Sequence, residues 1–219
     1  IGNATADGLY ITDKNGEIIV NGLEWGSYFF EEVSAPEGYA MPKNVRTATV
    51  VLSAANVEES LKTPLTVSLT NDKIYGNVEL LKVDDSTPAN ALPGAQFSLF
   101  TEDGDRVYVN GRDGAYAYSS KATDTVMVTP EDGRITVSQL PYGAYYFLET
   151  KAPSGYLVNS EHIGFKIEVN QAADEEPRVT RTCINSTVRA AISFLKADTV
   201  KDVPLTGAVF TLYKAGAGE

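Results

Sequence analysis

The sequence has very few of the residues from which common catalytic and metal sites are built. Its 219 residues include one cysteine, Cys183, and one histidine, His162. A single cysteine cannot form an intrachain disulfide, and a single histidine leaves no Cys/His set for zinc and no evident Ser–His or Cys–His pair. We therefore expect no disulfide, no metal site, no cofactor and no enzyme that turns over a substrate.

Basic residues and long apolar runs are also scarce. The 18 Lys and Arg residues are outnumbered by 29 Asp and Glu residues, giving a net charge of −11, and they form no basic stripe. A nucleic-acid partner is therefore not expected. No apolar run approaches the roughly 18 residues of a membrane-spanning helix, and no basic and apolar leader opens the chain. We expect a mature or excised piece with no membrane insertion in this segment.

The chain is instead rich in short strand patterns. Alternating or β-branched runs recur about every ten residues between turn clusters such as DKNGE, PEDGR and DDSTPAN. The best helix candidate is a turn or two at 54–61, so the spacing favours an all-β sandwich. The predicted strands are 8–12, 17–20, 28–33, 47–52, 65–69, 78–83, 95–100, 135–140, 145–151, 165–169, 179–184, 192–195 and 208–213.

An internal repeat sets the domain organisation. SYFFEEVSAPEGY at 27–39 matches AYYFLETKAPSGY at 144–156 with an offset of 117 (149 − 32). The stretch 78–100 matches 191–213, with its lysines offset by 114 (196 − 82), and LTND at 69–72 matches CINS at 183–186, also offset by 114 (185 − 71). The repeating unit is therefore about 115 residues long. We predict one complete domain at 74–187, preceded by the C-terminal part of a similar domain at 1–73 and followed by the N-terminal strands of another at 188–219.

Each unit directs polar side chains toward its apolar core. Because side chains alternate between the two faces of a strand, a Lys, a Glu and an Asn fall on faces that are otherwise largely apolar. Asn185 is the weaker case, because Arg181 shares its face of the strand. The first set is Lys82, Glu149 and Asn185. The second set is Lys196, Glu32 and Asn71.

A buried ammonium or carboxylate group is costly, so these residues require an explanation. One explanation is a Lys–Glu ion pair with the Asn hydrogen-bonded beside it. The other is chemical: a neutral Lys amine attacks the Asn carboxamide, a protonated Glu polarises the carbonyl and moves protons, and ammonia leaves. Burial favours the neutral forms of both groups, because desolvation lowers the pKa of a lysine and raises that of a carboxyl group. The residues alone leave both explanations open.

Six stretches carry a family resemblance. YYFLETKAPSGYLV, and more loosely SYFFEEVSAPEGYAM, resembles the Y-x-L-x-E-T-x-A-P-x-G-Y motif of the collagen-adhesin B-type (CnaB-like, SpaA-like) domains of Gram-positive surface adhesins and pilins. The two Lys-containing stretches resemble the first strand and the LxGAxFxLY segment of the same family. LTND and INST occur where the family's last strand carries its Asn. In the first copy Val33 stands where the family usually has Thr.

The resemblance implies a fold and a role. The fold is a tandem array of reverse-immunoglobulin β-sandwiches, in which an autocatalytic Lys–Asn isopeptide bond, assisted by the Glu, joins the first and last strands. The implied function is a structural stalk or backbone module of an adhesin or pilus, extracellular and attached to the cell wall. The alternative is an adhesive module that recognises host protein or carbohydrate through its loops. An aromatic-lined cleft in the insertion 102–131, around Tyr108, Tyr116 and Tyr118, would favour that alternative.

The two incomplete units lead to a further expectation. Residues 1–73 carry Glu32 and Asn71 without an opening Lys strand, whereas residues 188–219 carry Lys196 and little more of a domain. We predict that 188–219 completes 1–73, most simply by strand complementation from a neighbouring molecule. Lys196 would then meet Asn71 beside Glu32. The expected partners are therefore copies of the same protein, by complementation or head-to-tail stacking, and possibly a host ligand.

Overall fold

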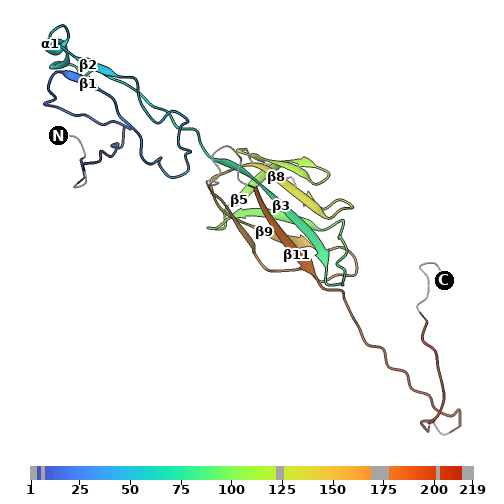
Figure 1. The fold of residues 1–219 in the computed structure, drawn as a ribbon. Coiled ribbons are helices and arrows are strands. Elements are labelled where there is room, and N and C mark those ends of the chain that lie inside the picture. Colours follow the sequence, from blue (N-terminus) through green and yellow to red (C-terminus); the bar gives the residue numbers. More distant parts are fainter. Residues whose placement is uncertain (1–3, 6–7, 122–125, 169–177, 201–202, 214–219) are drawn as a thin grey trace.

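The chain forms a β domain with a smaller lobe before it and an extended segment after it (Figure 1). The computed structural model describes residues 4–5, 8–121, 126–168, 178–200 and 203–213. We refer to 4–73 as the N-terminal lobe, 74–187 as the central domain and 188–213 as the C-terminal segment. The lobe and the segment lie at opposite ends of the central domain (Figure 1).

The central domain is a two-layered sandwich. In one layer β3 (Tyr75–Asp84) lies between β8 (Arg134–Pro141), antiparallel to it, and β11 (Arg178–Asn185), parallel to it. In the other layer β9 (Gly143–Lys151) lies between β4 (Gln96–Thr101) and β10 (Ile163–Ile167). The hairpin of β5 (Arg106–Arg112) and β6 (Ala115–Ser119) links the layers, and the short β7 (Met127–Val128) pairs with β4.

Side-chain alternation builds the core between these layers. Along β3 every second residue is buried, and the same period appears in β9. Leu80 from one layer and Phe97 and Phe147 from the other are completely buried. The rings of Phe97 and Phe147 meet edge to face with their centroids 6.4 Å apart. This alternation also turns Lys82 and Glu149 inward.

The N-terminal lobe and the C-terminal segment have little regular structure. The lobe contains β1 (Gly26–Tyr28), β2 (Val50–Leu52) and the single-turn helix α1 (Val57–Ser60), which lies within the predicted 54–61. Strands predicted at 17–20, 65–69, 192–195 and 208–213 do not form, because these runs find no ladder partner among the described residues. Some predicted positions lie outside the described residues. They are 201–202 and 214–219 of the predicted last unit, and Val169 of the strand predicted at 165–169.

The insertion 102–131 completes the sandwich rather than forming a separate loop. Its strands β5 and β6 were not predicted. In the turn between them Asp113 and Gly114 have φ of 52° and 80°, as a tight hairpin requires. Tyr116 is only 6% exposed, and its hydroxyl accepts a hydrogen bond from the Val128 N–H at 2.9 Å. It therefore belongs to the core and not to a ligand cleft. Residues 122–125 of the insertion lie outside the described residues.

Candidate functional site

Lys82, Glu149 and Asn185 meet inside the central domain. They come from β3, β9 and β11, and they are 0%, 4% and 1% exposed, respectively. Lys82 is among the largest completely buried side chains of the described residues. The parallel pairing of β3 with β11 sets Lys82 opposite Cys183, two residues before Asn185. Three strands that are distant in the sequence thus place an amine, a carboxyl group and a carboxamide in one dry compartment.

Glu149 is held on both carboxylate oxygens. Its Oε1 accepts a hydrogen bond from Asn185 Nδ2 at 2.9 Å, and its Oε2 accepts one from the Asn159 backbone N–H at 2.7 Å. The Asn159 side chain in turn donates to the Ile184 carbonyl on β11 at 3.1 Å. Asn159 was not predicted, because a backbone donor from the loop after β9 has no sequence signal. It ties that loop to β11 and fixes the orientation of the Glu149 carboxylate.

The Lys82 amine contacts carbonyl groups. Its Nζ donates to the Cys183 carbonyl at 3.1 Å and approaches the Val83 carbonyl at 3.4 Å. Among the residues that the structure describes, no ion pair with N···O of 4.0 Å or less involves Lys82. Desolvation lowers the pKa of Lys82, although nearby Cys183 and Glu149 partly oppose that shift. The environment therefore favours the neutral, nucleophilic form of the amine.

The carboxamide of Asn185 has one unsatisfied atom. Its Oδ1 is buried and has no hydrogen-bond partner. A rotation of the carboxamide by about 180° around the Cβ–Cγ bond would exchange the positions of Oδ1 and Nδ2. A protonated Glu149 could then donate to Oδ1. Such a bond would draw electron density from Cγ, the carbon that an amine would attack. The unsatisfied oxygen thus marks the site as unusual for a purely structural network.

The polar neighbours of Asn185 do not open the site to water. Arg181 shares its face of β11, but the Arg181 Nε donates to the Gly164 carbonyl at 2.8 Å, which directs the guanidinium across the neighbouring strand β10. Cys183 is 1% exposed, and burial raises its pKa to about 11, so its thiol stays protonated and inert. The Asn185 side chain therefore lies in a dry environment despite Arg181.

The N-terminal lobe contains a second Glu–Asn pair in which the Asn side-chain amide donates to the Glu carboxylate. Asn71 Nδ2 donates to the two carboxylate oxygens of Glu32 at 2.9 and 3.1 Å, and to the Ala40 carbonyl at 3.0 Å. Both side chains are half-buried. The backbone around them repeats that of the central domain: an antiparallel bridge joins Tyr39 to Lys73, as Tyr156 is joined to Thr187. The turn after Glu32 and the segment that carries Asn71 are therefore arranged like their counterparts in the central domain.

Lys196 occupies a hairpin like that of Lys82. The Leu205 N–H donates to the Lys196 carbonyl at 2.8 Å, as the Leu92 N–H donates to the Lys82 carbonyl at 2.9 Å. Lys196 itself is exposed, and the C-terminal segment runs away from the N-terminal lobe (Figure 1). Within one chain the structure therefore does not bring Lys196 to Glu32 and Asn71.

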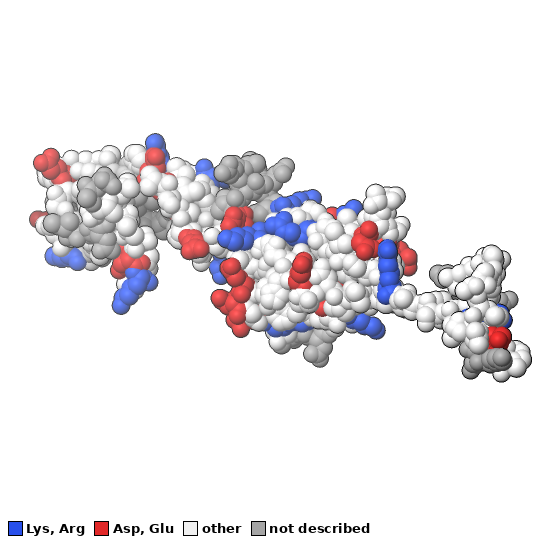
Figure 2. Space-filling view, turned by 90° about the horizontal axis from the view of Figure 1, so that it is seen from below, with Lys and Arg blue, Asp and Glu red and all other residues white. Residues whose placement is uncertain are grey.

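On the face shown in Figure 2, Lys and Arg side chains are interspersed with Asp and Glu. An open concavity of about 650 Å³ is lined by residues that include Tyr146, His162 and Arg181, with the rings of Tyr146 and His162 stacked at 3.9 Å between centroids.

No group of three or more potential metal ligands occurs among the described residues. None of the described helices has the length and apolarity needed to cross a membrane.

Comparison with known proteins identifies the family. The family described as SpaA, prealbumin-like fold domain, matches residues 2–66 and 76–179. The chain therefore belongs to this family, which confirms the resemblance and the all-β fold predicted from the motifs. The comparison with curated proteins gives no match.

Solved structures that match this chain include pilins. The Bacillus anthracis TIE protein is 24% identical with a TM-score of 0.57, covering 81% of this chain and 28% of its own length. The major pilin subunit BcpA of Bacillus cereus is 30% identical over 51% of this chain and 28% of its own, with a TM-score of 0.36. GBS52, the minor pilin of Streptococcus agalactiae, is 23% identical to this chain with a TM-score of 0.45. The match covers 84% of this chain and 70% of GBS52. This chain spans little more than a quarter of the first two proteins.

Proposed function

We propose that the chain is a structural module of an extracellular stalk, pilus or adhesin on a Gram-positive cell wall, covalently closed by a bond between Lys82 and Asn185. The family match and the pilin relatives support the stalk role. One observation carries the chemistry: a completely buried lysine amine shares a compartment with a carboxamide that is already hydrogen-bonded to a buried carboxyl group.

The reaction is a transamidation that happens once. The neutral Lys82 Nζ attacks Asn185 Cγ, while protonated Glu149 donates to Oδ1 and stabilises the developing negative charge. Glu149 then passes a proton from Nζ to Nδ2, the Cγ–Nδ2 bond breaks, and ammonia leaves. The product is an amide between Nζ and Cγ, and Glu149 regains the proton with which it began. The reaction needs no cofactor, oxidant or metal.

Intact mass under denaturing conditions tests this proposal. The folded chain should weigh one ammonia less than its sequence requires, and digestion should yield a branched peptide linking β3 to β11. Lys82→Met removes the nucleophile while keeping an unbranched apolar side chain of similar length, so its mass should equal that of its sequence. A full-sequence mass for the folded wild-type chain would refute the bond.

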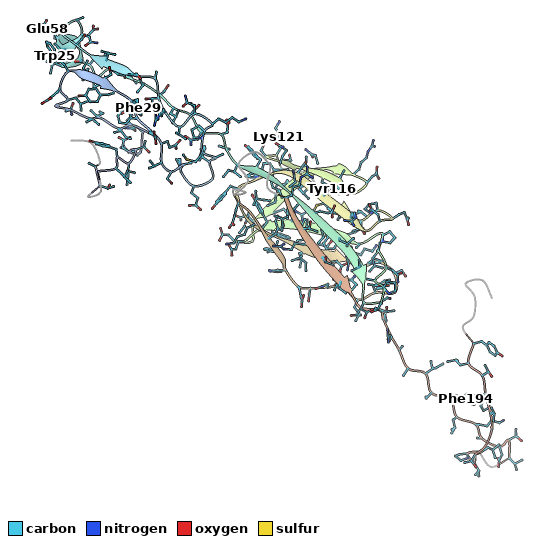
Figure 3. All side chains as sticks on the ribbon, in the orientation of Figure 1. Trp25, Phe29, Glu58, Tyr116, Lys121 and Phe194 are labelled. Atoms are coloured by element: carbon cyan, nitrogen blue, oxygen red, sulfur yellow. The ribbon has the colours of Figure 1, made fainter. Side chains whose placement is uncertain are left out.

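We also propose that the second set, Lys196 with Glu32 and Asn71, carries out the same chemistry between molecules. The preformed Glu32–Asn71 pair and the Lys196 hairpin each match their counterparts in the central domain. The C-terminal segment also exposes its apolar side chains: Phe194 and Phe210 are 72% and 60% exposed, whereas the matching Leu80 and Phe97 are buried (Figure 3). Insertion into the lobe of a neighbouring molecule would cover them.

A further inference from the structure

The N-terminal lobe and the central domain meet through a small, specific joint. Gly38 lies on Tyr142, close enough that an added Cβ would be 3.8 Å from the Tyr142 side chain. The Tyr142 hydroxyl donates to Glu37 Oε1 at 3.2 Å. Ala40 packs against the core of the central domain, and Ile74 is 6% exposed. A glycine loop of one unit is thus seated on an aromatic ring of the next.

The central domain carries the same loop at its other end, where it is uncovered. Tyr156 N–H donates to the Pro153 carbonyl at 3.2 Å, as Tyr39 N–H donates to the Pro36 carbonyl at 3.1 Å. Gly155 has a φ of 87°, against 82° for Gly38, but nothing lies within 4 Å of the position of its Cβ. The loop surface, which we define as Ser154, Gly155, Leu157 and Val188, corresponds to Glu37, Gly38, Ala40 and Ile74.

Exposure distinguishes the two loops. Leu157 and Val188 are 56% and 52% exposed, although their counterparts Ala40 and Ile74 are packed at the joint. The loop surface therefore presents two neighbouring apolar side chains beside a bare glycine. Such a patch is suited to contact with a flat aromatic ring.

The N-terminal lobe carries the matching aromatic residue. The sequence LEWGSYFFEE at 23–32 aligns with LPYGAYYFLE at 140–149, which places Trp25 at the position of Tyr142 (142 − 25 = 117). The turns have the same structure: the Tyr28 hydroxyl donates to the Glu24 carbonyl at 2.8 Å, as that of Tyr145 does to the Pro141 carbonyl at 2.9 Å. Trp25 is 67% exposed and lies at the end of the lobe away from the central domain (Figure 3).

We propose that Trp25 is a docking position for the loop surface of a second copy of this chain, so that copies stack head to tail through the joint already seen within one chain. The indole ring would cover Gly155, Leu157 and Val188. Its N–H would donate to the Ser154 hydroxyl, as the Tyr142 hydroxyl donates to Glu37. This proposal rests on the stalk role above and names the contact by which copies align, but it does not require the isopeptide bond.

Trp25 is the single tryptophan, so its fluorescence reports on this position alone. A contact made by one loop is much smaller than the roughly 1,200 Å² of a stable complex, so association will be weak. Wild-type chain at low concentration would therefore be titrated with Trp25→Ser copies up to about 1 mM, near the Kd of such weak contacts. The Trp25→Ser copies keep the loop surface but emit no tryptophan fluorescence. We expect a blue shift of the wild-type emission and a several-fold reduction in quenching by acrylamide.

Two further titrants make the outcome specific. Trp25→Ser copies that also carry Leu157→Glu and Val188→Glu should leave the emission unchanged, because charge replaces the exposed apolar pair. Copies that carry Leu61→Glu instead, at an 82% exposed position of the N-terminal lobe, should act like the intact titrant. The proposal is overturned if the intact titrant leaves the emission unchanged, or if the loop-surface variant shifts it equally. Neither outcome depends on the mass measurement that tests the isopeptide bond.

Discussion

At the residue scale, the role of Glu149 can be separated from folding. The residue is buried at the edge of the compartment and bonds two partners, neither of which belongs to the main apolar cluster. We expect Glu149→Ala to fold and to retain the full mass of its sequence, because no group remains to polarise Asn185 and move the proton. Glu79→Ala, which removes an exposed carboxylate paired with Arg134, serves as the matched control and should lose one ammonia.

The rate of bond formation should depend on pH through Lys82. Because desolvation lowers the pKa of this amine below its ordinary value of 10.5, the neutral form becomes abundant at a lower pH than in the unfolded chain. On refolding, ammonia loss should speed up as Lys82 loses its proton and slow again where Glu149 loses the proton that it must donate to Oδ1, so that the rate passes through a maximum. The measurement is mass against time in a series of buffers. A rate that does not change across the whole series would show that deprotonation of Lys82 does not limit the reaction.

The same shift predicts how stability varies with pH when Lys82 is unbonded. In Glu149→Ala the unfolded chain binds a proton at Lys82 more tightly than the folded chain does, so stability rises with pH between the folded and unfolded pKa values. Removing Glu149 also removes a charge that raises the pKa of Lys82, which widens this interval. Urea unfolding midpoints of this variant should therefore increase as the pH rises toward 10.5, the ordinary pKa of a lysine. The wild-type chain, if bonded, has no amine there and should lack the trend.

At the element scale, the bond would join β3 to β11 across a loop of 103 residues (185 − 82). By analogy with a disulfide closing a loop of this length, the stabilisation is about 5 kcal/mol. Lys82→Met should therefore lower the melting temperature of the central domain by roughly 15 °C. Calorimetry measures this, and retention of the wild-type melting temperature would show that the closed loop contributes little.

Sequence patterns predicted some elements much better than others. The strands that supply Lys82, Glu149 and Asn185 were predicted because each alternates and is flanked by turn residues. β5 and β6 were missed, since their Tyr-, Gly- and Asn-containing segments have no clear apolar period and depend on pairing with distant strands. The alternation of side chains along each strand predicted that the three site residues point inward. Their hydrogen bonds to Asn159 and to the Cys183 carbonyl could not be predicted, because the sequence pattern does not show where backbone donors and acceptors lie.

At the scale of the whole molecule, complementation between chains predicts covalent oligomers. If Lys196 of one molecule bonds Asn71 of another, concentrated chain should give a ladder of bands on a denaturing gel, because an amide survives detergent and heat. Lys196→Ala should abolish the ladder, whereas Lys14→Ala, another exposed lysine, should preserve it. Monomer alone at high concentration would refute complementation and leave the bond in the central domain unaffected.

The parallel pairing of β3 with β11 decides which parts of the module would feel tension. A pull applied through the N-terminal lobe enters at the start of β3, and a pull through the C-terminal segment leaves at the end of β11. With Lys82 bonded to Asn185, the tension would run along β3 to Lys82 and cross directly to Asn185. The core, the β5–β6 hairpin and every loop between these residues would carry no load. Such a module would keep a constant length under strain, and those loops could change in sequence without weakening it.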